Sequence, residues 1–111
     1  MKEIPKTALE RAVLERFHLL YGDKGFPGAN SIRVLGRNNT GGGRYVHLEC
    51  EAPVALADGY VDLGGSYLES SAVPDGLMAV VLVKGGRITM LEITVYGGGH
   101  WNGEEDEWRI V

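Results

Sequence analysis

The sequence predicts an α+β protein in which an N-terminal helix packs on a mostly antiparallel sheet of about four to five strands. Two observations support this fold class. Apolar residues recur at helical spacing over residues 7–21, and from residue 31 onward they alternate with a period of two. The chain has 111 residues, of which 44% are hydrophobic and 23% charged. These values suit one globular domain that spans 1–111.

The helix expected at 7–21 begins with a capping box. Thr7 and Glu10 stand three residues apart, the spacing at which each side chain accepts a hydrogen bond from the other residue's backbone N–H. Gly22 is expected to end the helix, and the DKGFPG segment that follows is expected to be a loop. The apolar stripe of the helix consists of Leu9, Ala12, Val13, Phe17, Leu20 and Tyr21.

Two strands are expected after this loop, at 31–37 and 44–50. In the second strand, Val46, Leu48 and Cys50 share one face, and the opposite face carries Tyr45, His47 and Glu49.

Residues 52–77 are harder to assign because turn residues interrupt their apolar pattern. A short strand is expected at 59–64. Pro74, Asp75 and Gly76 have the composition of a turn.

The clearest element is a hairpin at 78–96. Gly85 and Gly86 suit a two-residue loop whose twist matches that of the flanking strands. This loop predicts the pairs Lys84–Arg87, Val83–Ile88, Leu82–Thr89, Val81–Met90, Val80–Leu91 and Met78–Ile93.

Directly opposed residues share a face of a sheet, so this pairing divides the hairpin into two faces. We assign the helix to the face with Met78, Val80, Leu82, Leu91, Ile93 and Val95. The opposite face starts with Ala79, Val81, Val83, Ile88 and Met90 and turns polar at Glu92, Thr94 and Tyr96. Because one helix covers one face only, we expect segment 52–77 or a second copy of the chain to cover the apolar part of the second face. Exposed apolar patches of this kind mark interfaces.

Composition and charge argue against several functions. The formal net charge is −4, and the 11 lysines and arginines are scattered singly along the chain. Nucleic acids and anionic membranes are bound through basic patches, so neither is an expected partner. No leader-like apolar segment begins the chain, and no apolar run approaches the roughly 18 residues of a membrane span. We therefore expect a cytoplasmic protein.

The stretch NNTGGGRY at 38–45 resembles a phosphate-binding loop only superficially. Such a loop precedes a helix and usually contains a lysine followed by serine or threonine. Here the segment YVHLEC that follows has the pattern of a strand. We expect the glycines to form the turn between the two strands.

The single cysteine, Cys50, excludes a disulfide within the chain and a cysteine-based zinc site. His47 lies three residues earlier, but residues three apart on a strand point to opposite faces. We expect Cys50 to be a small buried residue rather than a nucleophile, and we expect neither a cofactor nor a metal.

A polar cluster is expected where the strand at 44–50 and the second hairpin strand lie side by side. A histidine beside two carboxylates can act as a general base or bind a cation. The simpler interpretation, which we favour, is a solvated sheet face with cross-strand pairs. The candidate ligand-binding residues are Tyr45, His47, Glu49, Glu92 and Tyr96.

The tail at 96–111 contains two tryptophans and an acidic run. We expect Trp101 and Trp108 to pin the tail to the body of the protein or to a partner, and EWRIV can form a last edge strand. His100 and the acids Glu104, Glu105, Asp106 and Glu107 show no recognisable ligand spacing. Acidic runs of this kind are usually solvated.

Four segments, GFPGA (25–29), VLGR (34–37), YVHLEC (45–50) and VLVKGGRITMLEITVYGG (81–98), resemble a group of small uncharacterised bacterial proteins. In that group, a helix is followed by a strand, a turn similar to D-G-R and another strand. The resemblance covers about two thirds of the chain. It implies the hairpin and an α+β fold, and it implies no activity.

The leading functional hypothesis is a non-enzymatic interaction module that self-associates and binds a protein partner, as small immunity or accessory proteins do. The expected interface residues are Val81, Val83, Ile88, Met90, Trp101 and Trp108. The alternative is a small-molecule-binding protein or an enzyme. Its pocket would lie between the helix and a curved sheet, with the polar cluster at its mouth.

Overall fold

The structure is a computed structural model that describes residues 3–97, 99–105 and 107–111. One helix, α1 (Ala8–Tyr21), is followed by two 3-10 turns, η1 (Gly22–Lys24) and η2 (Ala29–Ser31). The strands of the described residues are β1 (Arg33–Asn39), β2 (Gly43–Glu49), β3 (Gly59–Asp62), β4 (Leu68–Ser70), β5 (Val73–Lys84), β6 (Arg87–Val95) and β7 (Trp108–Ile110). Within these residues, no helix is long and apolar enough to cross a bilayer.

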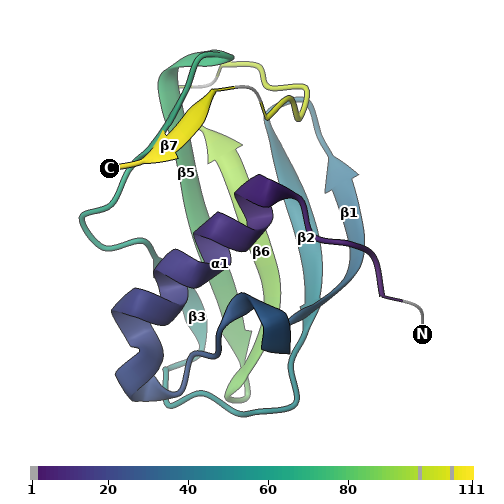
Figure 1. Ribbon diagram of the computed structural model, residues 1–111, viewed down its shortest axis with the longest axis vertical. Helices are drawn as coiled ribbons and strands as arrows, with labels where there is room; N and C mark the ends of the chain where they lie inside the picture. The colour runs from purple at the N-terminus through teal and green to yellow at the C-terminus, as the bar shows by residue number, and fades with distance from the viewer. Residues whose placement is uncertain (1–2, 98, 106) are drawn as a thin grey trace.

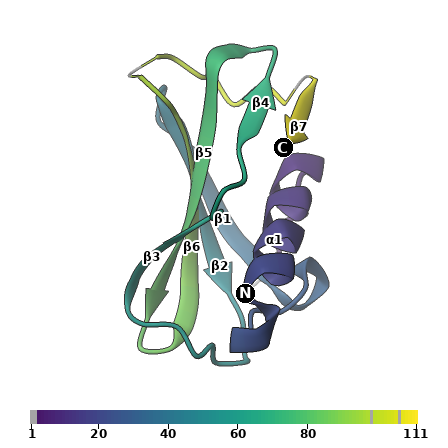
Figure 2. The same cartoon turned by 90° about the vertical axis from the view of Figure 1, so that its left-hand side faces the viewer.

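The molecule has two layers, with α1 on one face of an antiparallel sheet (Figures 1 and 2). The strand order is β1-β2-β6-β5-β4-β7, and β3 also pairs with β5. The α+β prediction is therefore confirmed. The expected four to five strands were too few, because the described part of the sheet has seven.

The additional strands come from the segments that were hardest to assign. β5 has 12 residues, so β4 pairs with its beginning and β3 with its end. The turn expected at Pro74, Asp75 and Gly76 is wrong, because all three residues belong to β5. Gly76 has a φ of +81°, and a glycine in this conformation bends a strand without ending it.

The hairpin turn is confirmed, with Lys84 opposite Arg87 and positive φ at both Gly85 and Gly86. The pairing beyond the turn differs from the prediction, because a β-bulge lies between Val83–Ile88 and Leu82–Met90. Thr89 is the extra residue, and its hydroxyl donates to the carbonyl oxygen of Leu82 at 3.2 Å.

From the bulge onward, the pairs are Val81–Leu91, Val80–Glu92, Ala79–Ile93 and Met78–Thr94. This shift of one residue changes the composition of both sheet faces.

The core lies between α1 and the inner face of the sheet. On the helix, Leu9, Val13, Leu14 and Phe17 are at most 1% exposed. Leu20 of the predicted stripe is 38% exposed, whereas Glu10 is fully buried. The sheet contributes Val34, Val46, Leu48, Leu77, Ala79, Val81, Val83, Ile88, Leu91 and Ile93 to this core.

Candidate functional site

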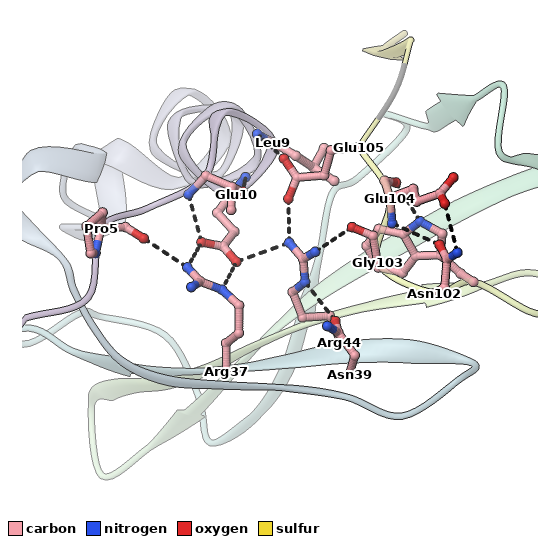
Figure 3. A network of polar contacts seen from close by, with 12 residues as sticks. Pro5, Leu9, Glu10, Arg37, Asn39, Arg44, Asn102, Gly103, Glu104 and Glu105 are labelled. Atoms are coloured by element: carbon pink, nitrogen blue, oxygen red, sulfur yellow. Dashed lines mark hydrogen bonds and ion pairs between the residues drawn. The ribbon is translucent and has the colours of Figure 1, made fainter.

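A buried carboxylate, that of Glu10, forms the centre of a polar cluster between α1 and the sheet (Figure 3). It accepts two hydrogen bonds from Arg37 of β1, at 2.8 Å from Nε and 2.5 Å from Nη2. A third comes from Nη1 of Arg44 on β2 at 3.2 Å. The capping box is confirmed, because Thr7 and Glu10 exchange backbone-to-side-chain hydrogen bonds at 3.0 and 3.1 Å.

Burial alone would raise the pKa of Glu10, because a carboxylate loses hydration there. The hydrogen bonds from Arg37 and Thr7, together with the positive charges of Arg37 and Arg44, outweigh this effect. They hold the pKa of Glu10 below its ordinary value of 4.5. Glu10 is therefore an ionised carboxylate at neutral pH.

Arg44 links this cluster to the C-terminal tail. Its Nη1 donates to Oε2 of Glu105 at 2.5 Å, and its Nη2 donates to the carbonyl oxygen of Gly103 at 2.8 Å. The guanidinium also lies over the ring of Trp101, 5.1 Å from the centroid. Cation–π contacts at this distance are attractive. The other carboxylate oxygen of Glu105 accepts the Leu9 N–H at 3.2 Å, so the tail also contacts the first turn of α1.

The cluster is saturated by the protein itself. Among the described residues, no buried side-chain nitrogen or oxygen lacks a hydrogen-bond partner. A buried polar network whose members are all paired rigidifies the elements that it joins. We interpret the Glu10 cluster as a structural connection between the helix, the β1–β2 hairpin and the tail.

The glycines of NNTGGGRY have structural roles, consistent with the predicted turn between β1 and β2. Gly41 has a φ of +86°, which a glycine adopts without strain. At Gly43, a Cβ would lie 2.6 Å from Cγ2 of Thr94 and 2.7 Å from the Ile93 carbonyl oxygen. Glycine at this position therefore allows β2 to approach β6 closely.

Among the described residues, no helix lies on the sheet face opposite α1 (Figure 2). We call it the outer face. By strand pairing it carries Arg33 and Asn38 of β1, Tyr45, His47 and Glu49 of β2, Tyr60 and Asp62 of β3, Met78, Val80, Leu82 and Lys84 of β5, and Arg87, Met90, Glu92 and Thr94 of β6. Directly paired residues form two adjacent rows across the strands. One row is Asp62–Val80–Glu92–Tyr45, and the other is Tyr60–Leu82–Met90–His47.

The two rows are joined by Tyr60 and Glu92. Tyr60 is 62% exposed. Glu92, as a hydrogen-bonding partner and as a negative charge, raises the pKa of Tyr60, with smaller contributions from burial and from Tyr45. Three polar or aromatic side chains from β2, β3 and β6 thus meet on the outer face.

Four of the five candidate ligand-binding residues, Tyr45, His47, Glu49 and Glu92, lie on the outer face. Tyr96 follows β6, where its ring stacks on Tyr67 at a centroid distance of 5.8 Å. The polar residues on β2 and β6 are therefore neighbours as expected, but they point away from α1. They do not line a space between the helix and the sheet.

The expected interface residues are mostly in the interior. Val81 and Val83 are fully buried, and Ile88 and Trp101 are 2% and 1% exposed. The bulge at Thr89 places Leu91 and Ile93 on the same face as Val81 and Val83. Helix α1 covers this face rather than the Val80 and Leu82 face to which we assigned it, so these side chains need no partner to cover them.

The remaining two expected interface residues are partly accessible. Met90 is half-buried on the outer face, and Trp108 is half-buried in β7. The expected edge strand in the tail is thus present at Trp108–Ile110.

Two parts of these sites were not anticipated from the sequence. Tyr60 and Asp62 were placed on a short strand, but nothing in the sequence indicated that this strand would pair with β5. Arg37 and Arg44 are basic residues on strands, and their common partner, Glu10, was visible only as a capping residue. In both cases the site is formed by contacts between segments that are distant in the sequence, and local patterns do not reveal such contacts.

The remaining polar candidates form no recognisable site. Cys50 is buried, as expected, with its thiol 3.7 Å from the Ala52 carbonyl oxygen. In the described part of the chain, no group of three or more His, Cys, Asp or Glu residues is arranged to hold a metal ion. Asp106 of the acidic run lies outside the described residues.

Four surface depressions of 560, 490, 480 and 120 Å³ occur around the sheet ends and edges. Helix α1 lines none of the four. The outer face thus remains the best candidate for a functional surface. Comparison of the chain with protein-family models, curated proteins and solved structures found no match.

Proposed function

We propose that this protein is a non-enzymatic interaction module that binds another protein through its outer face. The proposal retains the class of function expected from the sequence, but it moves the interface to a different set of residues. Small immunity and accessory proteins act in this way, by covering a partner's surface rather than by converting a substrate.

The observation that supports the proposal is the composition of the uncovered face. Tyr45 and Tyr60 are 37% and 62% exposed, and Val80, Leu82 and Met90 are half-buried between them. Tyrosine and methionine are enriched at protein interfaces, where aromatic rings contribute much of the binding energy. Polar side chains flank these residues, with His47 and Glu49 on β2 and Asp62 on β3.

The alternative of a small-molecule site between helix and sheet has less support. The side chains that fill this space are packed without exposure, including Val13 and Phe17 of α1 and Val46 and Val81 of the sheet. Small-molecule sites are concave and enclose most of the ligand. Of the polar candidates on the outer face, Glu49 borders the depressions of 490 and 480 Å³ at the sheet end, whereas Tyr45, His47 and Glu92 line none of the four.

The proposal can be tested by photo-crosslinking in the cells that make the protein. Tyr60 is replaced by p-benzoylphenylalanine, and the same substitution at Leu19 serves as the control. Leu19 is 75% exposed and lies on α1, in the other layer. We expect a discrete crosslinked product from position 60 that is absent from position 19.

Mass spectrometry of this product then identifies the bound protein, and sedimentation of the purified chain shows whether it is a second copy. The proposal requires that Tyr45→Ala weaken the crosslink at position 60. Equal crosslinking from positions 60 and 19, or no product at either position, would contradict it.

A further inference from the structure

The outer face has an electrostatic character that selects among protein partners. It holds the carboxylates of Glu49, Glu92 and Asp62, and its basic residues, Arg33, Lys84 and Arg87, lie on β1 and beside the Gly85-Gly86 turn. Glu49 forms an ion pair with Arg33. Within the described residues, no ion pair involves Glu92 or Asp62. The Asp62–Val80–Glu92–Tyr45 row therefore carries two carboxylates that form no ion pair with a basic side chain of the described residues, although Oδ1 of Asp62 accepts the Gly64 N–H at 2.8 Å.

These two carboxylates have a definite relation to the apolar residues. Asp62 and Glu92 flank Val80 in one row across β3, β5 and β6, so their strands are about 10 Å apart at the usual spacing. Leu82 and Met90 form the adjacent apolar row. Beside Asp62, a small crevice of 120 Å³ lies against Met78 and Tyr96.

We infer that the outer face binds a protein segment that presents a lysine or arginine side chain between Tyr45 and Tyr60. The inference rests on the proposed function and names the chemistry of its partner. The aliphatic part of the basic side chain would pack on Val80 and Leu82, as long charged side chains do on apolar surfaces. Its charged end would lie near Glu92, beside rings that favour cations.

Charge also argues against a second copy of the chain as the occupant. In a symmetric dimer through this face, the same patch meets itself. With the two-fold axis at the Asp62–Val80–Glu92–Tyr45 row, the carboxylates of Glu92 and Asp62 would approach those of the other copy, and like charges brought together in an interface are unfavourable. A basic anchor on a different protein removes this conflict.

The inference is tested by selecting peptides from a random displayed library on the immobilised full-length protein. We expect the selected peptides to be enriched in lysine or arginine next to apolar residues. A synthetic copy of one selected peptide is then titrated into isotope-labelled protein. Its amide shifts should localise to β2, β3, β5 and β6.

The Glu92→Gln variant keeps an oxygen that can accept the Tyr60 hydroxyl, but it removes the charge. We expect it to weaken binding of that peptide by about threefold to tenfold. Asp23→Asn is the matched control, because it removes one charge from the exposed η1 turn. It should leave the affinity unchanged.

Each possible result separates this inference from the proposed function. If the peptides localise to the outer face without basic enrichment, or if Glu92→Gln and Asp23→Asn behave alike, the inference is wrong and the proposed function stands. A homodimer that covers the outer face would also overturn the inference. If no peptide localises there and position 60 yields no crosslink, both proposals fail.

Discussion

At the scale of single residues, Glu10 is the side chain whose structural role differs most from the sequence expectation. It was expected to cap α1 from outside the apolar stripe, and it does accept the Thr7 N–H. It is also a buried anion held by two arginines from different strands. Removing one member of such a group leaves the other charges buried without a partner, and this is strongly destabilising.

We therefore expect Glu10→Gln to lower the free energy of unfolding at neutral pH by about 3–5 kcal/mol. The pKa of Glu10 is depressed in the folded protein, so the unfolded chain takes up the proton first as the pH falls. The stabilisation is present above the ordinary value of 4.5 and is lost as the pH falls through the folded value. Urea unfolding of both proteins between pH 7 and pH 3 measures this difference.

The control is Glu51→Gln, which neutralises an exposed carboxylate outside the cluster. Exposed substitutions of this kind usually change stability by less than about 0.5 kcal/mol. The difference between the wild type and Glu10→Gln should shrink below pH 4.5. A difference that stays constant with pH would show that the charge of Glu10 does not contribute.

At the scale of elements, local patterns predicted what local interactions determine. The capping box indicated the start of α1, and two glycines indicated the turn between β5 and β6. The bulge at Thr89 has no comparable signal, because β-branched and apolar residues continue through it. The pairing of β3 with β5 and of β4 with β7 depends on contacts between distant segments, which propensity and periodicity do not encode.

The candidate site was predictable to the same extent as its strands. Alternation along one strand placed Tyr45, His47 and Glu49 on a common face, and this placement is correct. Their neighbour Glu92 was also expected on that face, whereas Leu82 was assigned to the opposite one. A one-residue change in register exchanges the two faces of a strand. Because of the bulge, the residues of β6 beyond Thr89 pair with other residues of β5 than predicted, and the outer face therefore differs in composition from the expected interface.

The bulge leads to a prediction for two adjacent valines of β5. Val81 is fully buried under α1, whereas Val80 is half-buried on the outer face. We expect Val81→Ala to lower the free energy of unfolding by about 2 kcal/mol, because two buried methyl groups are removed and a cavity remains. Val80→Ala should lower it by less than about 1 kcal/mol. Both are measured by urea denaturation, and the reverse order would indicate that α1 covers the face of Val80 rather than that of Val81.

At the scale of the whole molecule, the C-terminal segment is part of the same structure as the helix and sheet. Trp101 is 1% exposed, and its backbone N–H donates to the Gly41 carbonyl oxygen at 2.8 Å. Farther along, β7 pairs with β4 near the N-terminal end of α1 (Figure 2). The cluster around Arg44 and Glu105 therefore joins the first and last parts of the chain through β2.

This connectivity predicts that the tail and the helix unfold together. A small domain with one core usually unfolds in a single cooperative transition, and here the tail contributes a buried tryptophan to that core. In a Trp108→Phe variant, fluorescence reports on Trp101 alone, while far-ultraviolet circular dichroism reports on α1 and the sheet. We expect the two signals to give the same midpoint and the same slope in urea. If the fluorescence changed at lower urea, the tail would be a separate unit that detaches first, and the Arg44 cluster would not couple it to the helix.

The Glu105→Gln substitution sharpens the test, because it weakens the connection to Arg44 and to the first turn of α1. In a coupled molecule it shifts both signals equally, whereas in an uncoupled one it shifts the fluorescence alone.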